Sequence, residues 1–243
     1  MKRFLLILII LAILGYLAFT AFYFKVNSQD KVCESFVVLV KDSIDKKFIH
    51  TKDIENLLNK EKLNPVGKTL STINTLEMEE TIYGNKLVKT VEVYATLDGS
   101  IVASIRQRNP VLRVIPHSVG SYYIDSEREI MPLSQHYTVY LPVATGQIDE
   151  EFAKNELYDF AIYISKNSKW NAWIEQIVVS SNHKVQIIPR AGDFRVNLGT
   201  LDDYEEKLDK LTLFIEKGLN KVGWNRYSEV NLEYNNQVVC TLK

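Results

Sequence analysis

The chain begins with a long apolar run that contains no charged residue between Phe4 and Phe24. Its one clearly polar side chain belongs to Thr20, whose hydroxyl can bond to a carbonyl of its own helix. A bilayer core about 30 Å thick needs about 20 helical residues, because unpaired backbone groups are costly in hydrocarbon. The run therefore predicts a transmembrane helix over residues 4–24. A cleaved signal peptide is the alternative, although its apolar region normally spans only about 7 to 15 residues.

The charges that flank this run predict its orientation. Lys2 and Arg3 precede it, whereas Lys25 alone follows it closely. Because cytoplasmic flanks are enriched in Lys and Arg, we expect residues 1–3 in the cytoplasm and the rest of the chain outside it, in the periplasm. Three residues are too few for a cytoplasmic module. Both interpretations of the apolar run export the remaining chain.

The next 75 or so residues predict one small mixed domain, which we expect over residues 32–109. Thr51 suits a helix N-cap, Asn74 and Glu77 have capping-box spacing, and Gly84 suits a helix end. The expected elements are a strand at 32–40, a helix from about residue 51, a helix between residues 74 and 84, and strands at 87–94 and 101–107. This order makes a three-stranded sheet covered on one face by two helices. It is the order of a POTRA domain, a docking module.

Beyond Asn109-Pro110 the pattern changes to short strands separated by turns, followed by helices, which predicts a mixed, β-rich domain over residues 110–243. Apolar stripes predict two helices around residues 157–164 and 208–215, the second capped by Thr200 with Asp203 three residues later. Strands are expected at residues 111–115, 121–124, 137–141, 173–179, 184–188 and 194–198. The fold class is therefore α+β.

The chain ends in two strand-like runs, at residues 230–234 and 237–242, separated by Asn235-Asn236. They predict a C-terminal β-hairpin. Only Lys243 follows the second run, and a terminal strand often lies at a sheet edge, where its unpaired backbone groups can accept a strand from a partner. The alternative is an internal hairpin whose edge is covered.

Composition and motifs argue against several other functions. Without Lys2 and Arg3, the 29 basic residues fall to 27 against 30 acidic ones, so the exported part lacks the positive charge of a nucleic-acid binder. Gly67-Lys68-Thr69 lacks the glycine that a phosphate loop needs at position 62. The four histidines are scattered, without metal-ligand spacing. We expect no cofactor, no metal and no small-molecule substrate.

The two cysteines, Cys33 and Cys240, lie at opposite ends of the exported part. In an oxidising compartment they could form a disulfide, but both have apolar neighbours among which a free thiol packs as a small hydrophobic side chain. Both interpretations remain open at this point.

Several segments, in order along the chain, resemble the extracytoplasmic part of the FtsQ/DivIB cell-division proteins. The matching stretches are Leu87-Val88-Lys89-Thr90-Val91-Glu92-Val93, Arg108-Asn109-Pro110-Val111, Tyr122-Tyr123-Ile124-Asp125, Leu141-Pro142-Val143-Ala144-Thr145-Gly146 and Val230-Asn231-Leu232-Glu233-Tyr234. The chain departs from the family pattern at Gln107, where the family has glutamate, at Arg128, where it has glycine, and at Glu233, where many members have arginine.

The resemblance implies a non-enzymatic scaffold of the inner membrane and division septum. Such a scaffold joins FtsB and FtsL in a heterotrimer and supports septal cell-wall synthesis, and its POTRA-like domain could dock further division proteins. In that family the last strands pair with a segment of FtsB. The residues implied to bind the partner are Tyr234, Gln237, Val238, Val239, Cys240, Thr241 and Leu242. Among them Tyr234, Val239, Thr241 and Leu242 are expected to supply selectivity.

Two other functions remain as alternatives. A membrane-anchored enzyme that acts on cell-wall components would fit the location and the unassigned second domain, but it needs a cleft with convergent carboxylates or a nucleophile. A POTRA module for outer-membrane export would normally accompany a strand-rich barrel or further repeats, which the pattern does not predict.

Overall fold

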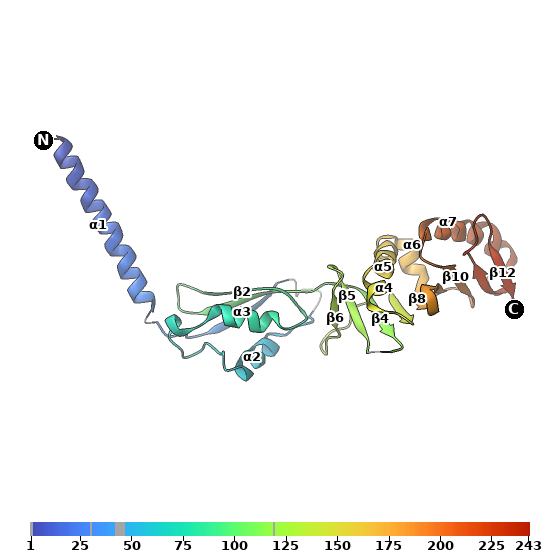
Figure 1. Cartoon of the computed structure of the whole chain (residues 1–243), viewed down its shortest axis with the longest axis horizontal. Helices are drawn as coiled ribbons and strands as arrows, with labels where there is room; N and C mark the ends of the chain where they lie inside the picture. Colours follow the sequence, from blue (N-terminus) through green and yellow to red (C-terminus); the bar gives the residue numbers. More distant parts are fainter. Residues whose placement is uncertain (1, 30, 42–46, 119) are drawn as a thin grey trace. The chain divides into compact units, whose positions relative to one another are not determined.

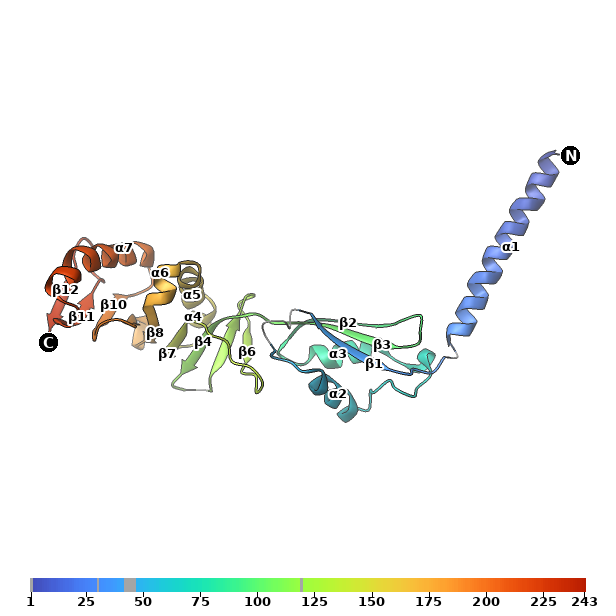
Figure 2. The same cartoon turned by 180° about the vertical axis from the view of Figure 1, so that it is seen from behind.

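The structure is a computed structural model that describes residues 2–29, 31–41, 47–118 and 120–243. The chain divides into two compact units, Met1–Gln107 (unit 1) and Arg108–Lys243 (unit 2), and each is described by itself. Figures 1 and 2 show the elements of both units from opposite sides.

Unit 1 begins with helix α1, which spans Lys2–Gln29. Among its described side chains, at residues 7–21, the apolar ones from Ile7 to Phe19 are exposed, and the Thr20 hydroxyl donates to the Leu17 carbonyl at 3.0 Å, as predicted. In the part of the chain that the structure describes, no helix is both long and apolar enough to cross a bilayer. Phe4 and Phe24, the predicted ends of the transmembrane helix, have side chains outside the described part, so the span stays a prediction.

The rest of unit 1 is a three-stranded sheet with two helices on one face (Figure 1). Its elements are β1 (Phe36–Lys41), α2 (Thr51–Lys60), the short helix η1 (Leu70–Thr72), α3 (Thr75–Tyr83), β2 (Val88–Ala95) and β3 (Ile101–Gln107). The strand order is β1-β3-β2, with β1 parallel and β2 antiparallel to β3. The parallel pair requires a crossover connection, which the helices supply. The predicted α+β class and POTRA-like order are confirmed.

Helix ends in unit 1 follow the capping residues closely. The side chain of Asn74 accepts the backbone N–H of Glu77 at 3.2 Å, as predicted, and α3 ends at Gly84. The start of α2 differs by one residue, because His50 rather than Thr51 is its N-cap and the Asp53 carboxylate accepts the His50 N–H at 2.8 Å. Buried apolar residues of both helices pack over the sheet: Ile54, Leu58, Met78 and Ile82.

Unit 2 is a nine-stranded mixed sheet with the order β12-β11-β10-β9-β8-β7-β4-β5-β6. Its strands are β4 (Pro110–Pro116), β5 (Tyr122–Asp125), β6 (Ile130–Pro132), β7 (Val143–Gly146), β8 (Ile174–Val179), β9 (Val185–Pro189), β10 (Arg195–Gly199), β11 (Tyr227–Asn231) and β12 (Val239–Leu242). Its helices are α4 (Glu150–Lys154), α5 (Glu156–Lys166), α6 (Ser168–Trp173), η2 (Ser181–His183), α7 (Tyr204–Phe214), the π-helical turn η3 (Ile215–Leu219) and α8 (Asn220–Val222).

Helices α5, α6 and α7 lie along one face of this sheet (Figure 1), and the core of unit 2 lies between them and the strands. Phe160 from α5 and Leu211 from α7 are fully buried there, together with Ile187 of β9 and Val196 of β10. No helix of the described residues lies on the opposite face, so the alternate residues of β8, β9 and β10 are partly accessible on that side.

Several predicted elements of unit 2 are wrong in detail. No strand forms at residues 137–141; the strand in that region is β7, two residues further on. Trp173 ends helix α6 instead of starting a strand, because the Asn167 side chain accepts N–H groups of Lys169 and Trp170 and starts a helix there. Helix α7 begins at Tyr204 with Asp203 as N-cap, while Thr200 bonds to the Asp202 side chain instead.

Candidate functional site

The terminal strand β12 is the outermost strand of the nine-stranded sheet. It pairs antiparallel with β11, with Val230 opposite Cys240 and Asn231 opposite Val239. No other strand of the described chain pairs with its outer side. One row of backbone N–H and C=O groups is therefore available to a further strand.

The structure separates the predicted partner-binding residues into a strand and a loop. Val239, Cys240, Thr241 and Leu242 form β12. Tyr234, Gln237 and Val238 lie in the connection between β11 and β12, outside any strand. The predicted bounds of the hairpin therefore need correction: its first strand lies three positions earlier, at Tyr227–Asn231 instead of residues 230–234, and its second strand begins at Val239 instead of Gln237.

The two faces of β12 differ, since side chains alternate along a strand. Cys240 is half-buried and packs with Val238 against the core, and burial raises the pKa of its thiol. Val239 and Thr241 are exposed on the other face. Leu242 is 59% exposed and lies on the same face as Cys240, so Thr241 and Leu242 present their side chains in opposite directions. A partner strand paired with β12 would therefore lie beside the face of Cys240 and Leu242 and beside the exposed face of Val239 and Thr241.

The connection that carries Tyr234 is held by two lysines that sequence reasoning missed. Lys210 of α7 donates from its ammonium group to the carbonyls of Leu232, at 3.2 Å, and of Tyr234, at 2.9 Å. Lys184 pairs with the Glu233 carboxylate at 2.8 Å. The Glu233 side chain also lies against Gly199, where an added Cβ would be 2.7 Å from the Glu233 Cγ. Glu233, which replaces an arginine of the family pattern, thus serves an internal contact.

The C-terminal end of β12 is held by hydrogen bonds from Ser228 and by an ion pair of Lys243, without a disulfide. The Ser228 hydroxyl donates to the carbonyls of Thr241 and Leu242, at 3.3 and 3.2 Å. The Lys243 ammonium pairs with Asp193 at 2.8 Å, and this contact lowers the pKa of the Asp193 carboxyl. Cys240 and Cys33 are both free thiols.

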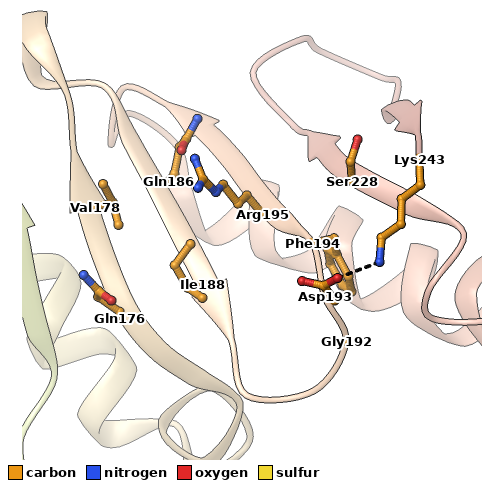
Figure 3. A pocket seen from close by; sticks show the side chains of 10 residues that line it. All are labelled: Gln176, Val178, Gln186, Ile188, Gly192, Asp193, Phe194, Arg195, Ser228 and Lys243. Carbon is orange, nitrogen blue, oxygen red and sulfur yellow. Dashed lines mark hydrogen bonds and ion pairs between the residues drawn. The ribbon is translucent and has the colours of Figure 1, made fainter.

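A groove of about 580 Å³ opens on the helix-free face, beside the terminal hairpin (Figure 3). Its floor is formed by Gln176, Val178, Gln186 and Ile188 of β8 and β9, and its rim by Arg195 of β10, Ser228 of β11 and the Asp193–Lys243 pair. It contains one carboxylate, already paired, and one hydroxyl, already bonded to backbone carbonyls. Among the described residues no group of three His, Cys, Asp or Glu side chains could hold a metal ion.

A buried ion pair joins two of the segments on which the family resemblance rests. Arg108 Nη1 donates to the Asp125 carboxylate at 2.7 Å, and Asp125 is 1% exposed. The other Asp125 oxygen accepts the N–H groups of Glu127 and Glu129, at 2.8 and 2.9 Å. Asp125 therefore shapes the β5–β6 turn as well as neutralising Arg108. The sequence motifs contained both residues, but their spacing did not show that they meet.

The other two departures from the family pattern have local explanations. Arg128 has φ +62, a conformation that glycine adopts without strain. Contacts of the Arg128 guanidinium offset this backbone strain: its Nη2 pairs with the Asp159 carboxylate at 2.5 Å, and its Cζ lies 4.3 Å from the centre of the Tyr158 ring. Gln107 is buried, and its side-chain oxygen accepts the Ile49 N–H at 2.8 Å.

Comparisons with known proteins agree with this architecture. Residues 109–241 match the family model described as FtsQ/DivIB, C-terminal related, and residues 31–106 match the model of the POTRA-like domain. The first match covers more than half of the 243 residues. A comparison with curated proteins gives no match.

Proposed function

Because the chain belongs to the FtsQ/DivIB family, whose domains indicate a scaffold role in cell division, we propose that β12 accepts a strand of FtsB. The observation that carries this proposal is the position of β12 at the outer edge of the sheet. Backbone hydrogen bonds would supply pairing, and the exposed side chains at Val239, Thr241 and Leu242 would supply selectivity. FtsL would join through FtsB, giving a heterotrimer that supports septal cell-wall synthesis.

The proposal includes an anchor in the inner membrane, with residues 1–3 in the cytoplasm, residues 4–24 in the bilayer, and the POTRA-like domain and unit 2 in the periplasm. Its support is the uncharged run from Phe4 to Phe24 and the positive charges that precede it. Confinement of scaffold and partners to the same membrane raises their effective concentration, so a modest strand-pairing interface can suffice. At the septum, unit 1 would dock further division proteins, as its POTRA-like fold suggests.

An enzymatic function on cell-wall components has weaker support. The groove beside the terminal hairpin is the place where such chemistry would be sought, but its carboxylate and hydroxyl groups are committed to Lys243 and to backbone carbonyls. General acid–base work needs a group free to exchange a proton with substrate. The family relationship also favours a scaffold without enzymatic activity.

A binding measurement on side-chain variants tests the proposed edge. Val239→Asp and Leu242→Asp place a charge on exposed positions of β12, 43% and 59% accessible, so the fold should tolerate them. Each should weaken FtsB binding about 10-fold or more, since burial of one such apolar side chain contributes about 1.5–3 kcal/mol. Leu213→Asp, at a 52% exposed position of α7, is the matched control and should bind normally. Equal affinities for all three variants would contradict the proposal.

A further inference from the structure

Three loops meet at one end of unit 1, and each exposes an apolar side chain there. Leu97, in the turn between β2 and β3, is 97% exposed. Val32, between α1 and β1, is 50% exposed, and Val66, between α2 and η1, is 49% exposed. We call these three residues the apolar tip. Single exposed apolar residues are ordinary, but three on adjoining loops suggest a surface that binds something.

Hydrogen bonds show that the three loops adjoin. The Cys33 N–H donates to the Lys68 carbonyl at 2.9 Å, and the Gly67 N–H donates to the Cys33 carbonyl at 2.9 Å. The Lys31 ammonium donates to the Leu97 carbonyl at 3.1 Å. The segments that carry Val32, Val66 and Leu97 are therefore tied into one end of the unit.

The turn that carries Leu97 does not need a leucine. Its polar neighbours satisfy one another: the Asp98 carboxylate accepts the hydroxyl of Thr96, and the Ser100 N–H bonds to the Thr96 hydroxyl at 3.2 Å. Gly99 supplies the positive φ, +96, that the turn requires. A polar residue would serve equally well at position 97, so its apolar side chain is better explained by a binding partner than by folding.

The position of the tip along the chain identifies that partner. Val32 follows the last residue of α1, Gln29, by three positions, a span of at most about 11 Å. The uncharged run ends at Phe24, about 7.5 Å of helix before Gln29. Given the membrane anchor of the proposed function, on which this step rests, Val32 lies within about 20 Å of the hydrocarbon boundary. We propose that the apolar tip inserts into the interfacial layer of the bilayer that holds the anchor.

Charge at this end of unit 1 argues for apolar insertion instead of attraction to anionic lipid. Lys31 and Lys68 are offset by Glu34 and Asp98 on the same loops. A balanced surface gains little from the negative potential of anionic headgroups. The tip should therefore bind bilayers of purely zwitterionic lipid, and anionic lipid should add little.

The test uses the full chain reconstituted into zwitterionic vesicles that contain lipids brominated near the headgroup. Leu97→Trp and Val66→Trp each add one tryptophan at an exposed tip position, so the fold should be unaffected. Tyr83→Trp is the matched control, because Tyr83 is 57% exposed at the end of α3, near the start of β2. The turn at Leu97 follows the other end of β2, about 25 Å away along that strand. The natural tryptophans, Trp170, Trp173 and Trp224, all belong to unit 2 and give the same background in every variant.

We expect bromine to quench the tryptophan of both tip variants beyond the parent chain, and iodide in the water phase to quench it less than in Tyr83→Trp. Replacing a third of the lipid by an anionic one should leave the result unchanged. Tip tryptophans that behave like the one at position 83, in protein that floats with the vesicles, would overturn this proposal alone. Protein that does not float with the vesicles would overturn the anchor as well.

Discussion

The two edges of the nine-stranded sheet are built differently. At one edge, β6 has three residues and ends in Pro132, while Met131 is fully buried. At the other, β12 has four residues, none of them proline, and exposes Val239, Thr241 and Leu242. Short strands and proline are common protections of an edge against pairing with another chain. The comparison indicates that β6 is a closed edge and that β12 is the open one.

The largest effect should come from the ion pair that supports the closed edge. Asp125→Ala leaves the Arg108 guanidinium, 16% exposed, without its partner and removes the acceptor for two N–H groups of the β5–β6 turn. We expect a loss of about 3 kcal/mol in the free energy of unfolding. Urea denaturation measures it. Asp159→Ala, which breaks an ion pair with roughly half-exposed partners, is the control and should cost about 1 kcal/mol or less.

The open edge can be closed by introducing a proline. In an antiparallel strand, consecutive residues direct their backbone groups to opposite sides, so of Cys240→Pro and Thr241→Pro one removes an N–H that faces β11 and the other an N–H that faces a partner. We expect the variant that loses the partner-facing N–H to keep normal stability. It should bind FtsB at least about 10-fold more weakly, a loss of about 1.4 kcal/mol in binding free energy. Calorimetry of binding together with thermal unfolding measures both. If neither proline separated binding from stability, the open-edge account would fail.

Substitutions of Arg128 in the β5–β6 turn, at the closed edge, should change the free energy of unfolding by a smaller amount. At φ +62, alanine retains the strain of Arg128 but loses its contacts with Asp159 and Tyr158, whereas glycine loses the contacts and the strain. Arg128→Gly should therefore be more stable than Arg128→Ala by about 1 kcal/mol. Chemical denaturation of the two variants measures the difference. An alanine variant as stable as the glycine variant would show that the turn is not strained at this residue.

The smallest effect concerns pH and the end of the open edge. Lys243 lowers the pKa of Asp193 below its usual value of 3.8. A carboxyl with a depressed folded-state pKa contributes stability that is present above the unfolded value and lost as pH falls through the folded one. The tether should thus be constant between about pH 5 and 8 and weaken below about pH 4. Amide exchange of Leu242 measures it, and Asp193→Asn should abolish this pH dependence.

Helix caps and the alternation of apolar residues predicted those helices and strands that depend on residues close together in the chain. The cap at Asn74 set the start of α3, and the alternation of Ile101, Ala103 and Ile105 marked β3, because both depend on residues a few positions apart. β7 was missed, since it is an inner strand held in parallel register by β4 and β8. Its Gly146 is required by the Val179 carbonyl, which would lie 1.9 Å from an added Cβ and is 33 positions away in the chain.

The same distinction between local and long-range causes applies to the candidate site at the terminal hairpin. The strand character of β12 was readable from Val239 to Leu242, but the contacts that fix the connection before it were not. Lys184 and Glu233 are 49 positions apart, and Lys210 is 24 positions from Tyr234. Such pairs meet only after the sheet and α7 have formed, so a single sequence does not reveal them.

Hydrogen exchange measured with and without an FtsB segment tests the central claim most directly. The account predicts that FtsB slows amide exchange within Val239–Leu242 and leaves exchange within Ile130–Pro132, at the closed edge, unchanged. Binding of FtsB with no added protection in β12, or with protection at β6 instead, would contradict it.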